Sequence, residues 1–360
     1  MRRIFFVIFL FIGACIDPLN VKVTESDRLL VVDGLITNLP GPYQVKLFYS
    51  NSLSTSRLAP FEPVTHAVVV IVDDLDNNYN LTEVSPGLYE TDPNELTGEI
   101  GRSYYVSIKT QGEVEFQSTI QKLTEPGEIS NLYFELDNES ASGNDGELKV
   151  YIDSKGVSNE ENLFRWRWTT IHKTIASPEL HTTTTPRGEI RTPEPCSGYV
   201  LRQGQLVQVG ECTCCICWSY NYSEGSFVSQ NDFVSENTFN KQFLGKIPVT
   251  AMHFYDRYYF EVQQLSLSEE AYSFWNLVEK QQKSATDLFQ PDAVKIKGNI
   301  KNVSDPSKEA LGFFGVSGVA SVTTDIQESQ IPYALPEIET VPHSCLDYFK
   351  YPTTEKPPFW

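Results

Sequence analysis

Short apolar runs rich in β-branched and aromatic residues, separated by polar turn residues, recur along much of the chain after residue 27. In the run Tyr43–Tyr49, apolar positions alternate with Gln44 and Lys46, which places one face on a core and the other in water. Turn sequences such as Pro40–Gly41–Pro42 separate these runs. The strands expected in the first part are Leu29–Thr37, Tyr43–Tyr49, Ala67–Val72, Leu88–Thr91, Tyr104–Lys109 and Val114–Ile120. This pattern predicts an immunoglobulin-like β-sandwich at residues 28–123.

A second β-rich domain is predicted at residues 124–330. The stretch Thr124–Glu128, which contains Pro126 and Gly127, is expected to link the two domains. The strand candidates beyond it are Ile129–Leu136, Leu148–Ile152, Leu163–Thr170, Val249–Gln263, Val294–Ile300 and Gly312–Val322. The predicted fold class is therefore mainly β.

One strand of the second domain has aromatic residues on one face and arginines on the other. Phe164, Trp166 and Trp168 alternate with Arg165 and Arg167, and alternate side chains of a strand point to opposite faces. We interpret the aromatic face as core. The alternative is an exposed stacking platform.

A single amphipathic helix is predicted at residues 268–283. Ser268 can cap its start, and Glu269 and Glu270 favour its positive N-terminal end. Its apolar stripe has helical spacing and consists of Ala271, Phe274, Trp275 and Val278. We expect this stripe to pack on the second sheet, with membrane docking as the alternative.

Residues 173–248 lack a regular pattern and are predicted to be a large loop insertion. Four consecutive threonines, Thr182–Thr185, precede a proline, and most of the cysteines follow in a Gly-, Ser- and Asn-rich background. Long loops within regular domains often carry binding function, so this segment is the expected partner-contact region. The last segment, residues 331–360, is predicted to be a proline-rich tail.

The N-terminus has the layout of an export signal. Arg2 and Arg3 precede the apolar run Ile4–Ile12, which is about half the length of a membrane-spanning helix. Gly13–Ala14 before Cys15 resembles a bacterial lipobox, in which the cysteine is lipidated after cleavage. The alternative is an ordinary cleaved signal with Cys15 as a structural thiol.

We therefore predict a signal peptide at residues 1–14 and a lipidated tether at residues 15–27. Acyl chains on Cys15 would then be the membrane attachment, because no other apolar run approaches a transmembrane length. The formal net charge of the 360-residue chain is −19, and removal of Arg2 and Arg3 would make it −19 − 2 = −21. Such an acidic chain repels phosphate backbones, which excludes nucleic acid as an expected partner.

Six cysteines remain after Cys15, an even number that favours disulfides in an exported protein. The disulfide candidates are Cys196, Cys212, Cys214, Cys215, Cys217 and Cys345. Two overlapping C-x-x-C spacings leave thiolate metal binding and redox chemistry as alternatives. The neighbours Cys214 and Cys215 are expected to bond elsewhere rather than to each other.

Sequence signatures of catalysis are missing. Asp74–Asn78 offers alternate carboxylates and amides, but Tyr79 and Ser85 stand where a calcium loop needs Gly and Glu, so a hairpin turn is expected. The histidines are scattered, at positions 66, 172, 181, 253 and 343. We predict no enzymatic activity, no cofactor and no resident metal. A carboxylate pair assembled by folding would be the exception.

Several segments in order resemble the DUF4249 family of Bacteroidota outer-membrane lipoproteins. They are Cys15–Pro18, Leu30–Thr37 with Pro40–Tyr43, Ser266–Trp275, Lys297–Ile300 and Gly312–Ser317. The resemblance implies an outer-membrane lipoprotein of unknown biochemical function, often associated with TonB-dependent receptors. It supplies no catalytic residues.

The expected function is that of a lipid-anchored cell-envelope protein in the outer membrane. It would act as an accessory or ligand-binding partner of a TonB-dependent transporter, a β-barrel of the outer membrane. The alternatives are a freestanding structural or adhesive surface module and a surface glycan hydrolase.

Overall fold

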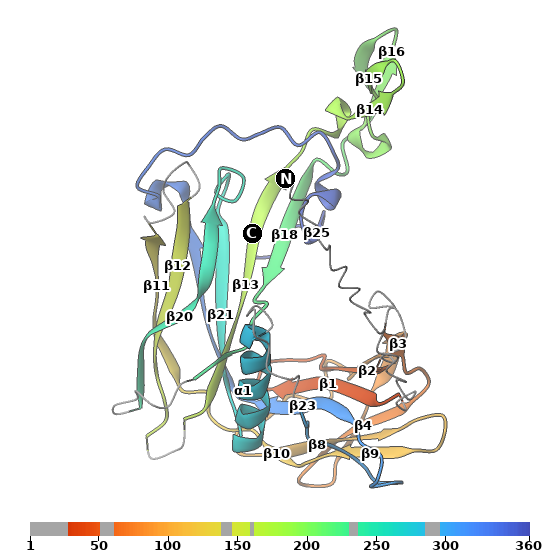
Figure 1. Cartoon of the computed structure of the whole chain (residues 1–360), viewed down its shortest axis with the longest axis vertical. Helices are drawn as coiled ribbons and strands as arrows, with labels where there is room; N and C mark the ends of the chain where they lie inside the picture. Colours follow the sequence, from red (N-terminus) through yellow and green to blue (C-terminus); the bar gives the residue numbers. More distant parts are fainter. Residues whose placement is uncertain (1–27, 51–60, 138–145, 159–161, 230–236, 285–295) are drawn as a thin grey trace, which may run out of the picture.

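The computed structural model describes residues 28–50, 61–137, 146–158, 162–229, 237–284 and 296–360. It is mainly β: one sandwich lies across the bottom of Figure 1, a second stands upright above it, and a small head projects at the top. The expected signal peptide, Cys15 and the tether at residues 15–27 lie outside the described residues. Within the described part of the chain, no helix is both long and apolar enough to span a membrane.

Two sheets form the first sandwich. The elements in sequence are β1 (Leu30–Thr37), β2 (Gln44–Tyr49), β3 (Glu62–Pro63), β4 (Val68–Asp73), β5 (Asn78–Asn80), β6 (Thr82–Ser85), β7 (Leu88–Glu90), β8 (Ser103–Lys109), β9 (Glu115–Ser118), β10 (Gln121–Lys122), β22 (Ile300–Asn302) and β23 (Leu311–Ser317). The first sheet has the order β23-β1-β2-β7-β6, with β3 on β2. The second has the order β22-β9-β8-β4-β5, with β10 on β8.

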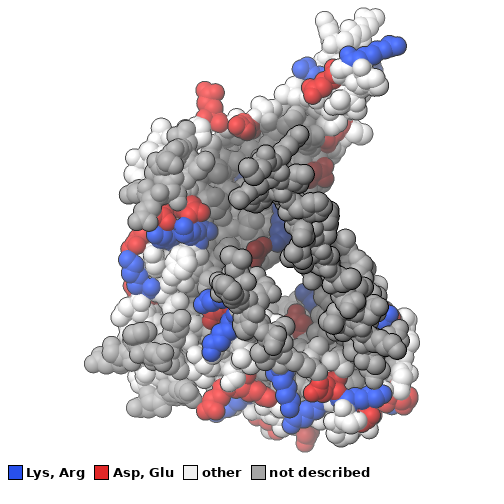
Figure 2. All heavy atoms as spheres, in the orientation of Figure 1, with Lys and Arg blue, Asp and Glu red and all other residues white. Residues whose placement is uncertain are grey.

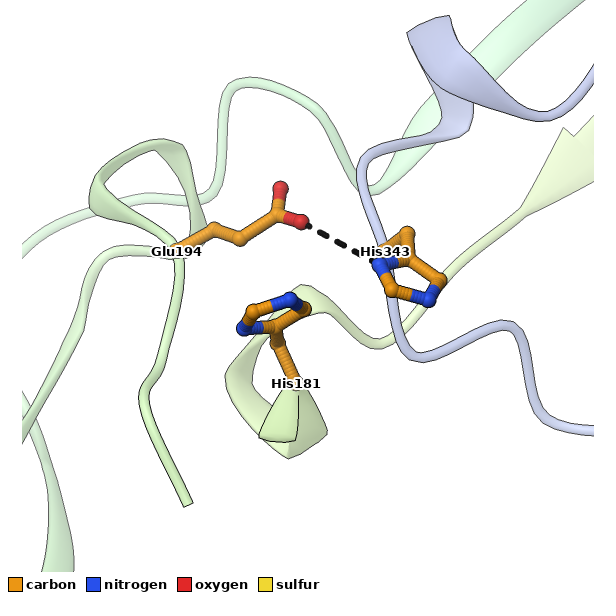
Figure 3. Close-up of side chains that lie close together, drawn as sticks. All are labelled: His181, Glu194 and His343. Atoms are coloured by element: carbon orange, nitrogen blue, oxygen red, sulfur yellow. Dashed lines mark ion pairs between the residues drawn. The ribbon is translucent and has the colours of Figure 1, made fainter. Parts of the chain in front are cut away.

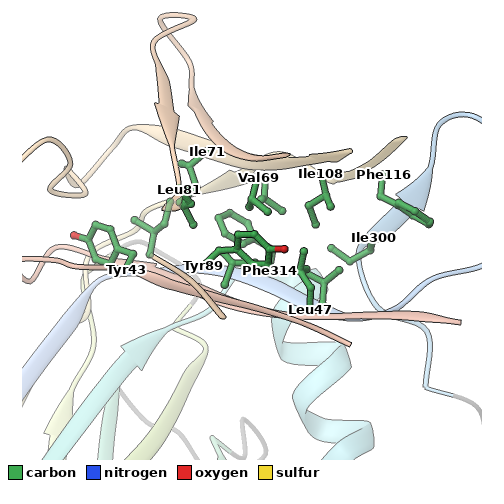
Figure 4. Close-up of a cluster of buried hydrophobic side chains, with 14 of the residues drawn as sticks. Tyr43, Leu47, Val69, Ile71, Leu81, Tyr89, Ile108, Phe116, Ile300 and Phe314 are labelled. Atoms are coloured by element: carbon green, nitrogen blue, oxygen red, sulfur yellow. The ribbon is translucent and has the colours of Figure 1, made fainter. Parts of the chain in front are cut away.

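The core of this sandwich lies between the two sheets (Figure 4). Val32 and Val45 of the first sheet and Val106 and Ile108 of the second are fully buried. They occupy alternate positions of their strands, as the apolar-polar pattern predicts. The prediction of a mainly β fold that begins with a sandwich is thus confirmed.

The chain returns to this sandwich from far downstream. Residues 300–317 are predicted to belong to the second domain, but β23 pairs in parallel with β1 and β22 pairs with β9, so they complete the first sandwich. Phe314 of β23 is fully buried in the first core. The expected single strand Gly312–Val322 divides at Gly318, where a Cβ would collide with the carbonyl oxygen of Thr124.

The second sandwich also has two sheets. Its strands are β11 (Glu128–Asp137), β12 (Gly146–Lys155), β13 (Phe164–Ile175), β18 (Ile216–Tyr222), β19 (Phe227–Val228), β20 (Thr238–Val249), β21 (Tyr258–Ser266), β24 (Val319–Ile326) and β25 (Tyr351–Thr353). One sheet has the order β11-β12-β20 and the other β24-β21-β13-β18-β25, with β19 on β13. A short 3₁₀ turn at Glu328–Gln330 follows β24, and another at Cys345–Asp347 lies in the C-terminal tail.

The aromatic face of β13 is core, as expected. Phe164 and Trp166 are 1% and 0% exposed, and Trp168 is half-buried against the same cluster. The Trp166 indole donates a 2.7 Å hydrogen bond to Gln264 Oε1, so its polar atom is satisfied inside the core. The opposite face of β13 therefore presents the two arginines.

Helix α1 (Glu269–Ser284) forms where the sequence predicts it. The Ala271 amide donates to Ser268 Oγ at 3.1 Å, which is the expected cap. The helix covers more than the second sheet, however, because Phe274 also packs against Phe313 of β23 with ring centroids 4.9 Å apart. Figure 1 shows α1 at the junction of the two sandwiches.

The segment around Asp74–Asn78 is a hairpin turn between β4 and β5. Asp73 Oδ1 accepts hydrogen bonds from the amides of Leu75 and Asn77, both at 2.9 Å. Burial alone would raise the pKa of Asp73, but these bonds and the nearby Arg102 lower it. The polar residues of this stretch thus organise the turn.

The predicted loop insertion at residues 173–248 is too long. Its ends belong to β13, β18 and β20, and the part that projects is residues 176–215. This part, which we call the head, contains β14 (Thr182–Thr185), β15 (Gly188–Arg191), β16 (Tyr199–Arg202), β17 (Gln205–Gln208) and 3₁₀ turns at Pro178–Leu180 and Pro195–Ser197. The sequences of β18 and β20 mix polar and apolar residues without a regular period, so they are not predicted as strands. Their pairing with β13, β25 and β12 stabilises them in the structure.

Candidate functional site

A cleft of about 520 Å³ lies between the two sandwiches. Strands β1, β2 and β23 of the first sandwich line one side, and β13, β21 and α1 line the other. Its charged lining residues are Asp33, Lys46, Arg165 and Arg167. The cleft wall is thus net positive by two charges in a chain whose formal charge is −19.

Arg165 is held in the cleft by an aromatic ring. Its guanidinium carbon lies 3.5 Å from the centroid of the Trp275 ring of α1. The Nε atom is buried and has no hydrogen-bond partner among the described residues. Burial, with a smaller effect of Arg167, lowers the pKa of Arg165 to about 10, and Asp33 opposes this shift. The side chain therefore remains charged at neutral pH.

Arg167 lies two residues further along the same face. Its Nε donates a 2.7 Å hydrogen bond to Gln263 Oε1 of β21, which fixes the guanidinium plane. Burial lowers its pKa, and the charge of Glu261 partly offsets this. Among the described residues neither arginine forms an ion pair with a carboxylate.

Two neighbouring guanidinium groups without carboxylate partners are suited to an anionic ligand. Each presents a planar fork of N–H donors that matches a carboxylate or a phosphate. The volume lies in the usual range for small-molecule sites, about 300–1,000 Å³. The lining contains one carboxylate, Asp33, so this cleft does not provide the pair that glycoside hydrolysis requires.

The acidic surface is not gathered into one patch on the face drawn in Figure 2. Acidic and basic side chains are interspersed over both sandwiches there. The positive charge of the cleft lining therefore contrasts with the mixed charges on this face and with the net negative charge of the chain. The alternation of β13 predicts that Arg165 and Arg167 lie opposite the core. It does not identify them as a site, because the other residues that line the cleft come from distant parts of the chain.

The six predicted cysteines form three disulfides, Cys196–Cys214, Cys212–Cys215 and Cys217–Cys345. Two of them lie within the base of the head, and the third ties the tail to β18. Cys214 and Cys215 bond elsewhere, as expected. All six sulfurs are bonded in this arrangement, so none of them is a thiolate that could bind a metal.

The fold brings scattered histidines into two pairs, which no sequence motif indicates. His172 and His253 have ring centroids 4.5 Å apart in the second sandwich. Burial holds the pKa of His172 well below its usual range and lowers that of His253 to about 4, so this pair is neutral. His181 and His343 have ring centroids 5.0 Å apart at the base of the head.

Comparison with known proteins identifies one sequence family. The family described as "Domain of unknown function (DUF4249)" matches residues 16–323. No curated protein matches. Among solved structures, a DUF4785 family protein from Legionella pneumophila has 8% identity and a TM-score of 0.19, over 66% of this chain and 52% of its own.

Proposed function

The chain belongs to the DUF4249 family, and on the chemistry of the cleft we propose that it is a binding protein for a small anionic ligand. The observation that carries this proposal is the pair Arg165 and Arg167, half-buried and without ion-pair partners in the described part of the chain. Burying two cations costs free energy unless an anion compensates it. A bound carboxylate or phosphate would supply that compensation.

The ligand we propose carries a flat or apolar part next to its anionic group. The Trp275 ring and the apolar side chains Leu265, Leu267 and Phe313 line the cleft beside the arginines. Such a mixture of apolar wall and a few charged groups orients a ligand and gives specificity. The third candidate function, glycan hydrolysis, has no comparable support in this cleft.

We expect the double substitution Arg165→Gln and Arg167→Gln to abolish anion binding. Each guanidinium lost removes charge-assisted hydrogen bonds, so the affinity should fall about 100-fold or more. Isothermal titration of the purified chain with benzoate, phenyl phosphate and inorganic phosphate at constant ionic strength measures this. At least one of the three should bind with one-to-one stoichiometry.

A matched control is Arg202→Gln, which removes an exposed arginine from the head and should leave the affinity unchanged. If none of the three anions binds the native chain, or if the double variant binds as well as the native chain, the cleft is not the site. Circular dichroism establishes that the variants are folded.

We further propose that the protein is anchored to the outer membrane by lipid on Cys15 and serves a TonB-dependent transporter, with the head as contact region. Exposed apolar side chains on the head support a protein partner. These residues are Ile190, Val200, Leu201 and Val209, between 36% and 56% exposed.

Purification from native outer membrane in mild detergent tests this partnership. A β-barrel transporter should co-purify at near one-to-one ratio. Leu201→Asp should reduce recovery of the transporter at least about tenfold, because it places a charge in an apolar contact. Leu75→Asp, at a site 67% exposed in the first sandwich, is the control that should have no effect. Recovery of the protein alone would favour the freestanding module instead.

A further inference from the structure

We propose that His181, Glu194 and His343 form a binding site for a divalent transition metal, with Zn²⁺ the best-matched ion. One ligand atom from each residue can be chosen so that all lie within 4.8 Å of one another. Figure 3 shows the three side chains converging from separate segments of the chain. The site is distinct from the arginine cleft and does not depend on the function proposed for it.

His181 is oriented as metal-binding histidines usually are. Its Nδ1 lies 2.9 Å from the carbonyl oxygen of Thr192 and 3.1 Å from the Thr192 hydroxyl. A proton on Nδ1 is therefore donated to the carbonyl, and the lone pair is left on Nε2. A second hydrogen bond of this kind fixes the ring and its tautomer in many metal sites.

Glu194 lies beside His343 in the cluster. Its Oε2 accepts a 3.0 Å hydrogen bond from the Ser344 amide, and its Oε1 lies 3.6 Å from His343 Nδ1. The side chain is 19% exposed, so the carboxylate is largely removed from water. Of its oxygens, Oε1 has no hydrogen-bond donor in the described residues and faces the cluster.

Disulfides fix the segments that carry the proposed ligands. Cys196, two residues after Glu194, is bonded to Cys214. Cys345, two residues after His343, is bonded to Cys217 of β18. This arrangement lowers the conformational entropy that metal binding would otherwise cost.

Backbone hydrogen bonds join the same segments directly. The Glu194 amide donates to the Pro178 carbonyl at 3.0 Å, three residues before His181. The Ser177 amide donates to the Val341 carbonyl at 2.8 Å, two residues before His343. All three ligand segments are therefore cross-linked at the base of the head before any metal arrives.

Two imidazoles and one carboxylate match zinc sites that keep an open position for a further ligand. Tetrahedral coordination with bonds of about 2.0–2.1 Å requires ligand atoms about 3.3 Å apart, so the cluster must contract on binding. The His343 side chain is 54% exposed and can make this movement. Its exposure also opens the fourth position to water or to a donor from a partner.

The test is a titration of the purified, fully oxidised full chain with ZnCl₂ in competition with a chromogenic chelator. Cys15→Ser removes the one cysteine outside the three disulfides, and free-thiol counting on this chain should then find no thiol, so that cysteine ligands are excluded. We expect one Zn²⁺ per chain, and Co²⁺ should give the absorption of a four-coordinate N/O site. His181→Ala, His343→Ala and Glu194→Gln should each weaken Zn²⁺ affinity at least about tenfold.

His66→Asn is the matched control, because His66 is exposed in the first sandwich and Asn tolerates its positive φ of 56°. It should leave Zn²⁺ affinity unchanged. His343→Ala should leave the fold intact because this side chain is mostly exposed, so a loss of Zn²⁺ affinity in this variant reports on the site and not on unfolding. Failure of the native chain to bind Zn²⁺, or equal binding by the double variant of His181→Ala and His343→Ala, would overturn the proposal.

Discussion

A fragment of residues 28–123 is expected not to fold when it is produced alone. It contains every strand predicted for the first sandwich but lacks β22 and β23. Without β23 the fragment loses Phe314 and Val316 from its core and exposes the edge of β1. Circular dichroism and amide proton dispersion in an NMR spectrum should show an unfolded or aggregated chain.

The matched control joins residues 297–318 to the same fragment through a flexible linker. This addition restores both missing strands, and the fused chain should give a cooperative unfolding transition. In the full chain, Phe314→Ala should cost about 3–5 kcal/mol of unfolding free energy, as other large-to-small changes at aromatic core positions do. Leu75→Ala, at an exposed site, should cost less than about 0.5 kcal/mol. A fragment of residues 28–123 that folds by itself would show that β23 is dispensable.

Loss of the Cys217–Cys345 disulfide is expected to have the second large effect. Its cysteines are separated by 128 residues, and closing a loop of that length restricts the unfolded chain by about 5 kcal/mol in the chain-entropy model. We therefore expect the variant with both Cys217→Ser and Cys345→Ser to unfold at much lower denaturant concentration. The tail should also separate from β18 and become sensitive to protease.

The control is the Cys212–Cys215 disulfide, whose cysteines are separated by only 3 residues. The same model gives about 2 kcal/mol for its removal. Guanidinium unfolding of the two double variants, both measured without reductant, compares the effects. Equal destabilisation by the two pairs would mean that loop closure does not govern the contribution of the long disulfide.

The three disulfides also connect stability to the proposed metal site. Removing Cys217–Cys345 frees the segment that carries His343, whereas removing Cys212–Cys215 leaves all three proposed ligand segments tied. The first variant should therefore lose Zn²⁺ affinity and the second should retain it. If the two variants differ in Zn²⁺ affinity in this way, metal binding depends on ligand segments that the disulfide holds in place. Equal affinities would mean that the histidines bind Zn²⁺ without that constraint.

Local patterns along the sequence determined most of the secondary structure. Alternation places β2, runs of β-branched and aromatic residues place β1, β4 and β8, helical spacing places α1, and the aromatic face of β13 is buried as its periodicity predicts. The even number of cysteines that remains after Cys15 likewise predicted the disulfides. These features depend on neighbouring residues, whose preferences a sequence displays directly.

Only the tertiary structure decided which distant segments meet. Strand β23 joins β1 across more than 270 residues, since it pairs Val31 with Leu311. The cleft forms only because the fold brings Arg165 and Arg167 together with Trp275 and Asp33. The proposed metal ligands likewise come from distant positions, 181, 194 and 343. Such contacts are set by the burial of whole sheets and by disulfide closure rather than by local preference. They therefore leave no periodic signal in the sequence.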